Sequence, residues 1–107
     1  ELKSLRDMAM AKFARAMDRY DAVLAPAAPG AAPRGLEATG RPDQSRAWQL
    51  LGVPQITLLA GVDDASMPLG MQLIGRQRGD VRLLDIALWF QDELGWKGEI
   101  PPAFRRQ

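Results

Sequence analysis

Hydrophobic and polar positions follow a helical period near both ends of the chain. From Leu2 to Arg19, apolar side chains recur every three or four residues, which predicts an amphipathic helix. From Val81 to Leu94, large apolar side chains cover more than one stripe, so we expect a helix buried on several sides, capped by Asp80 and ended by Gly95. A sheet of about three strands cannot bury such a helix alone. We therefore infer a missing covering layer, either the rest of a larger chain or a second copy.

Two shorter apolar runs in the middle of the chain predict a β-hairpin. The runs Val53–Ala60 and Leu69–Ile74 have the length of strands and are bounded by Gly and Pro. The intervening residues 61–66 are rich in Asp, Ser and Gly, which favour local bonds between side chain and backbone. In the second run apolar residues alternate with Gly70 and Gln72, so one face is apolar. A glycine inside a strand is typical of a bulge, or of a close approach by a backbone or ligand.

The segment before the hairpin combines a short strand, a long loop and a short helix. Ala22–Ala25 is a short apolar run that suits a buried strand. Pro26–Pro42 is rich in Pro, Gly and Ala, and a loop of this length is either functional or a mobile surface loop. The helix that follows runs through Leu51, where Gly52 is placed as its C-terminal cap and Pro54 prevents continuation.

These elements predict one α/β unit over residues 1–107 with the order α-β-α-β-β-α. Its parts are a helix at 1–20, a short strand and Pro-rich loop at 21–43, a helix and hairpin at 44–75, a helix at 80–95 and a tail at 96–107. The chain begins at Glu1, inside a segment that already reads as helical. We therefore expect it to come from something longer.

The composition excludes several classes of function. The apolar content of 47% and charged content of 25% are those of a globular protein. A net charge of +1 with dispersed arginines gives no case for binding nucleic acid or an anionic membrane. With no Cys and no His, a disulfide, a thiolate nucleophile, a His-based triad and an ordinary zinc site are all excluded. No apolar run approaches the roughly 20 residues that span a bilayer and no signal-peptide pattern is present, so we expect a cytoplasmic location.

The hairpin region resembles a known family. The segments GVPQITLLAG and MPLGMQLIG are similar to the C-terminal hairpin of the amidase signature family, written G-x-P-x-x-[ST]-x-P-x-G and L-P-x-G-x-Q-x-I-G. Upstream, Tyr20-Asp-Ala-Val-Leu-Ala-Pro26 is similar to the family's Y-D-x-x-[LI]-x-P-[TA] element, and Leu83–Leu94 resembles its final helix. The structural motif positions in this chain are Gly52, Pro54, Thr57, Gly61, Pro68, Gly70, Gln72, Ile74 and Gly75. Three positions depart from the pattern, with Leu59 in place of Pro, Gln49 in place of Asn and Met67 in place of Leu.

The resemblance implies the C-terminal segment of a carboxamide hydrolase with a mixed β-sheet flanked by helices, and no metal or organic cofactor. Such enzymes use two serines and a lysine. The catalytic serines and lysine lie in regions of the family that this sequence does not contain. The lysines and serines of this sequence lie outside any Gly-Ser-rich segment: Lys3, Lys12, Lys97, Ser4, Ser45 and Ser66. We therefore carry over no catalytic residue, and expect Asp63-Asp64 to be a solvated turn. The segment alone is expected to be inactive.

The resemblance leaves a supporting role near the substrate. The segment would complete the sheet and form part of the cleft wall, with the remainder of the amidase chain and a small amide substrate as partners. Trp48, Gln49 and the Pro26–Pro42 loop are the candidates for substrate contact, although a Trp at this spacing also suits a core position.

Three alternatives stay open at this point. The apolar last helix also suits a non-catalytic interaction module that self-associates or binds a partner. Arg76, Arg78 and Arg82 suit a solvated turn or, less directly, a phosphate contact. Within the same family, a transamidation subunit would differ from a simple amidase in its substrate rather than in its chemistry.

Overall fold

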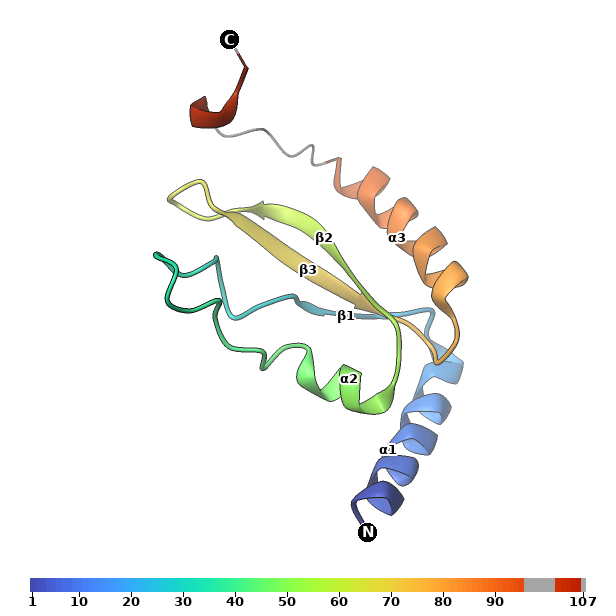
Figure 1. Ribbon diagram of the computed structural model, residues 1–107. Helices are drawn as coiled ribbons and strands as arrows, with labels where there is room; N and C mark the ends of the chain where they lie inside the picture. Colours follow the sequence, from blue (N-terminus) through green and yellow to red (C-terminus); the bar gives the residue numbers. More distant parts are fainter. Residues whose placement is uncertain (96–101, 107) are drawn as a thin grey trace.

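The computed structural model describes residues 1–95 and 102–106, and it is an α/β arrangement of a three-stranded sheet with surrounding helices (Figure 1). In chain order the elements are α1 (Leu2–Ala16), the 3₁₀ helix η1 (Met17–Arg19), β1 (Val23–Pro26), α2 (Arg46–Leu51), β2 (Gln55–Val62), β3 (Pro68–Ile74), α3 (Asp80–Leu94) and the 3₁₀ helix η2 (Pro102–Phe104). Of the expected tail, residues 96–101 and 107 lie outside the described residues.

The central strand of the sheet is β3, which pairs with β1 on one side and with β2 on the other. Leu73 is the partner of Leu24 on β1 and of Ile56 on β2, so these three side chains share one face. Gln72 is the partner of Ala25 and Thr57 and therefore belongs to the opposite face. Both pairings are antiparallel. The three described strands are thus not by themselves the mixed sheet that the resemblance implies, because none of them has a parallel neighbour.

Helix α3 covers the apolar face of the sheet along β2 and β3 (Figure 1). Leu83 and Ala87 on the helix pack with Leu58 and Leu73 on the strands and form one buried cluster. Three further apolar side chains in the core are Met17, Val53 and Ile74. The opposite side of α3 is open, since Leu84, Leu88 and Trp89 are 53% to 62% exposed. The described residues thus cover only one face of the helix, as expected for a sheet of three strands, and the further covering layer stays a prediction.

The hairpin turn is held by the carboxylate of Asp63. Its Oδ1 accepts hydrogen bonds from the backbone N–H groups of Ala65 and Met67, each at 2.9 Å. Such bonds are typical of an Asp that closes a turn, and they are the local bonds between side chain and backbone that the composition of residues 61–66 favours. The limits of the strands differ from the predicted runs, since β2 begins and ends two residues later, at Gln55 and Val62, and β3 begins one residue earlier, at Pro68.

Glycine and arginine residues define where the helices end. Gly52 and Gly95 follow α2 and α3 with φ values of 67° and 61°, so both predicted C-terminal caps are confirmed. Asp80 is the first residue of α3 rather than its cap, and Gly79 holds the cap position. At the end of η1, the guanidinium Nη2 of Arg76 donates to the carbonyl oxygens of Met17 at 2.7 Å and Tyr20 at 3.2 Å. These charge-assisted bonds fasten the end of the first helical segment to the segment that follows β3.

Candidate functional site

A cavity of about 480 Å³ lies on the sheet face opposite α3, beneath the Pro-rich loop. Its lining comprises loop residues 27–33 and 39–41, together with Thr57 of β2 and Pro68 and Gly70 of β3. Most of this lining is Ala, Pro and Gly, so the walls are small and apolar. The charged side chain in the lining, Arg41, is paired with Asp43 at 3.0 Å on the surface. The cavity thus joins the loop to three positions of the family motif.

Gly70 allows the loop to lie close to the sheet. A Cβ atom at this position would be 2.9 Å from Cγ2 of Thr57 and 3.1 Å from Cβ of Ala27, closer than side chains normally approach. The backbone N–H of Ala27 donates to the Gly70 carbonyl oxygen at 3.1 Å. The pairing register between β2 and β3 shifts between Leu59 and Gly61, next to Gly70. This position therefore shows both a strand bulge and a close approach by another backbone, the two features that a glycine within a strand indicates.

Gln72 holds both ends of the loop. Its side chain is buried, with 3% of its surface exposed. The amide Nε2 donates to the carbonyl oxygen of Pro26 at 2.9 Å and also to the carbonyl oxygen of Gln44. Because the amide nitrogen carries two hydrogens, it can satisfy both acceptors at once. The sequence marked Gln72 as a motif position, but nothing local to it identified these partners.

The remaining motif residues support the backbone around the hairpin. The N–H of Gly75 donates to the carbonyl oxygen of Pro54 at 3.0 Å, and a Cβ at Gly75 would lie 3.3 Å from Cβ of Leu83 on α3. Gly61 faces open space, because nothing lies within 4 Å of the place its Cβ would occupy. These residues therefore fix geometry rather than supply reactive groups.

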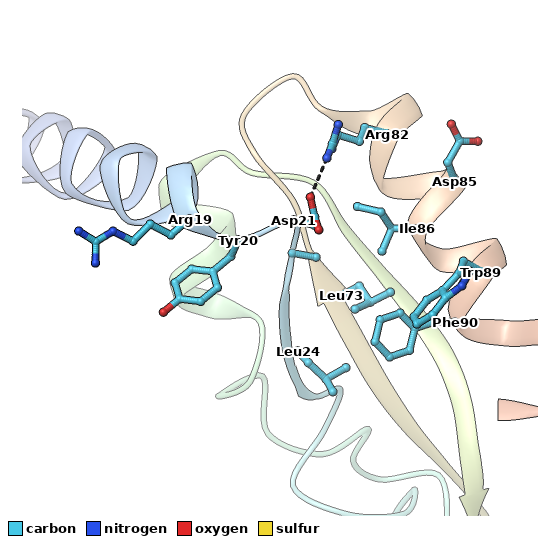
Figure 2. A pocket seen from close by; sticks show the side chains of 11 residues that line it. Arg19, Tyr20, Asp21, Leu24, Leu73, Arg82, Asp85, Ile86, Trp89 and Phe90 are labelled. Carbon is cyan, nitrogen blue, oxygen red and sulfur yellow. Dashed lines mark hydrogen bonds and ion pairs between the residues drawn. The ribbon is translucent and has the colours of Figure 1, made fainter. Parts of the chain in front are cut away.

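A larger groove of about 680 Å³ lies on the other face of the sheet, between β1 and α3 (Figure 2). Leu24 and Leu73 form its floor, and Ile86 and Phe90 extend toward the floor from α3. At one end, Nη2 of Arg82 bonds Oδ1 of Asp21 at 2.7 Å. Both side chains of this pair are more than 60% exposed, so the ion pair is well solvated and adds little stability. The groove was not predicted, because its walls come from segments about 60 residues apart along the chain.

Trp48 and Gln49, the two residues that the resemblance placed near substrate, lie on α2. The half-buried Trp48 ring packs against Phe13 of α1, with the ring centroids 5.9 Å apart. Gln49 is exposed. Neither side chain lines the loop cavity or the groove.

Neither the loop cavity nor the groove is lined by a serine or a lysine among the described residues. Lys3, Ser4 and Lys12 lie on α1, Ser45 directly precedes α2, and Ser66 lies in the hairpin turn. Within residues 1–95 and 102–106, no group of three or more Asp or Glu side chains is placed to hold a metal ion. Over the same residues, none of the helices has both the length and the apolar character needed to cross a membrane.

Comparison with known proteins identifies the family. The sequence model described as Amidase matches residues 1–84, and on this ground the chain belongs to the Amidase family, which confirms the resemblance of its hairpin. Among curated proteins, the chain is 34% identical over 106 residues to a glutamyl-tRNA(Gln) amidotransferase subunit of Neisseria meningitidis serogroup A, a match that covers 92% of this chain and 22% of that protein. It is 33% identical over 109 residues to the protein of the same name from Thioalkalivibrio sulfidiphilus, with 95% and 22% covered. The chain thus spans about a fifth of the length of these relatives, and no solved structure matches it significantly.

Proposed function

We propose that this chain is the C-terminal part of a longer amidase, in which it completes the sheet and forms one wall of the substrate cleft. The observation that carries the proposal is the loop cavity, where the family positions Thr57, Pro68 and Gly70 meet the Pro-rich loop. Both outer strands, β1 and β2, have a free edge among the described residues. Strands from the remainder of the protein would extend the sheet at these edges into a mixed one. The apolar groove and the exposed side of α3 would then be covered by that remainder.

The serine and lysine groups that cleave the amide would come from outside this chain. The cavity wall contributes mainly small apolar side chains, together with the hydroxyls of Thr39 and Thr57 and the Arg41 guanidinium that pairs with Asp43. Such a lining suits a neutral carboxamide better than a charged group. Trp48 and Gln49 remain candidates for contact with substrate at the α2 side. Neither a metal ion nor an organic cofactor takes part in this proposal, and a cytoplasmic location remains a prediction.

The test compares the full-length protein that the gene encodes with this chain alone. Ammonia release from a panel of carboxamides is expected for the full-length protein and not for residues 1–107. Ser45→Ala and Ser66→Ala serve as matched controls, and both are expected to leave the activity of the full-length protein unchanged. A folded full-length protein that hydrolyses none of the amides would contradict the proposal. So would turnover by the chain alone that either serine variant abolishes.

A second candidate within the family is a transamidation subunit. It is favoured by the names of the curated relatives, which are glutamyl-tRNA(Gln) amidotransferase subunits. Conversion of glutamyl-tRNA(Gln) to its amidated form, assayed with glutamine as the nitrogen donor, would support this candidate. Release of ammonia from simple amides without any need for tRNA or a further subunit would support the amidase.

A third candidate, the non-catalytic interaction module, draws on the exposed side of α3. Leu84, Leu88 and Trp89 present apolar surface to solvent on one helix. The variant Leu88→Lys of the full-length protein separates the two cases, with sedimentation as the measure of oligomer formation. If the remainder of an amidase covers α3, this variant destabilises the full-length fold. If α3 is a free interaction surface, the same change disperses an oligomer and leaves the fold intact.

A further inference from the structure

We propose that Gln72 is a positioning residue that holds the Pro-rich loop closed over the cavity, and that this closure sets the size of amide that the cavity accepts. The second part rests on the proposed amidase function, whereas the first can be tested without it. Gln72 itself lies outside the cavity lining, so its action on a ligand would be exerted through the loop.

The loop has few bonds of its own. Between Ala27 and Arg46, the backbone hydrogen bonds of the described residues lie at the loop's ends: Ala27 donates to Gly70, and Ser45 and Arg46 donate to the carbonyl oxygen of Pro42. Prolines inside the loop have no N–H to donate, which limits any ladder that it could form internally. The position of the loop therefore depends on what its ends are fastened to.

Gln72 fastens both ends with one side chain. Its Nε2 donates to Pro26 and Gln44, which stand 46 and 28 residues away along the chain. The amide is neutral, so it can be buried here without the cost of burying a charge. A methionine has a similar length but no N–H group, and a glutamate would point acceptor oxygens at two carbonyl oxygens.

The sheet face offers a matched control. Gln55 of β2 is a half-buried glutamine, and its register with Ile74 places it on the same face as the buried Gln72. No side-chain hydrogen bond joins Gln55 to the loop among the residues described here. The substitution Gln55→Met therefore changes the same chemistry on the same face without touching the loop.

The first measurement is trypsin cleavage of the full-length protein at the bond from Arg34 to Gly35. Trypsin cuts poorly before proline, so Arg41, which precedes Pro42, does not compete. Gln72→Met and Gln72→Glu are each expected to speed this cut about tenfold, the change that corresponds to about 1.4 kcal/mol. Gln55→Met is expected to leave the rate unchanged. Equal rates for the folded Gln72 variants and the unaltered protein would overturn the proposal.

The second measurement separates a positioning role from general stability. In the full-length amidase, Gln72→Met is expected to raise KM for a compact amide severalfold, to change kcat little, and to reduce the preference for compact over bulky amides. If Gln72 only stabilises the fold, the variant lowers the fraction of active enzyme, so apparent kcat falls while KM stays constant. That result would overturn the proposal. If the full-length protein has no amidase activity, the proposed function fails while the trypsin result still decides whether the loop is held.

A measurement on the unaltered protein covers the case in which the variants do not fold. Hydrogen exchange of full-length protein is expected to be at least tenfold slower at Ala27 and Ser45 than at Gly35 in the middle of the loop. Exchange over the whole of residues 27–45 at the rate of an unstructured peptide would overturn the proposal.

Discussion

The substitution Gly70→Ala tests how closely the loop and the hairpin are packed. The added Cβ would lie 2.9 Å from Cγ2 of Thr57 and 3.1 Å from Cβ of Ala27. Overpacking of this kind costs about 1–3 kcal/mol, whereas replacing a strand glycine by alanine returns about 0.5–1 kcal/mol of backbone entropy. We expect a net destabilisation of about 1–2 kcal/mol at the hairpin.

The partner substitution Thr57→Ser identifies the contact responsible. Serine keeps the hydroxyl and removes Cγ2, the atom nearest to the new Cβ of Gly70→Ala. The remaining neighbour, Ala27, lies on a loop that can give by a few tenths of an ångström. The double variant is therefore expected to recover about 1 kcal/mol relative to the sum of the two single changes.

Hydrogen exchange of the β3 amides in the full-length protein measures both effects. Since about 1.4 kcal/mol corresponds to a tenfold change, Gly70→Ala should speed exchange about tenfold and the double variant should nearly restore it. Gly61→Ala is the matched control on the same hairpin, because a Cβ there meets nothing within 4 Å. Additive effects of Gly70→Ala and Thr57→Ser, or an equal effect of Gly61→Ala, would refute the close-contact explanation.

Three further changes probe the packing and the helix ends. Met17→Ala removes a side chain that is 1% exposed and should cost about 2–5 kcal/mol in thermal or denaturant unfolding, whereas Met8→Ala on the exposed side of α1 should cost under about 0.5 kcal/mol; similar losses would contradict the assigned core. Arg76→Gln removes the bonds to the end of η1 and should cost about 1 kcal/mol, seen as faster amide exchange over residues 17–20, with Arg78→Gln as the neutral control. Gly52→Ala forces a side chain into the left-handed conformation and should cost about 1–2 kcal/mol; an unchanged melting midpoint would show that α2 ends in another way.

The arginines after β3 are exposed, and two of them make contacts that their charge pattern alone does not reveal. The sequence suggested that Arg76, Arg78 and Arg82 form a solvated turn or a phosphate contact. In the structure, Arg76 binds backbone carbonyl oxygens of the first helical segment and Arg82 pairs with Asp21. All three acceptors are more than 50 residues away along the chain, so no local pattern could reveal them.

The sequence alone determined the local structure of the chain. Two apolar runs of strand length marked the hairpin, and Gly52 and Gly95 marked the ends of two helices. These signals depend on preferences within a few residues of the chain. The spacing of the hairpin motif also identified the family, since it preserves both residue types and intervals. The helix ends that glycine marks were therefore predictable, whereas the limits of β2 were not, since it spans Gln55–Val62 rather than Val53–Ala60.

Tertiary structure decided how these elements combine. It placed the loop on the face opposite α3, made Gln72 the link between residues on both sides of that loop, and left one side of α3 open among the described residues. It also packed Trp48 against Phe13, away from both cavities. The periodicity of apolar residues indicates which side chains face inward. The residue that such a side chain contacts depends on which distant segment the folded chain brings beside it. For this reason the sequence could name Gln72 as a motif position, whereas its two bonds became visible only in the folded chain.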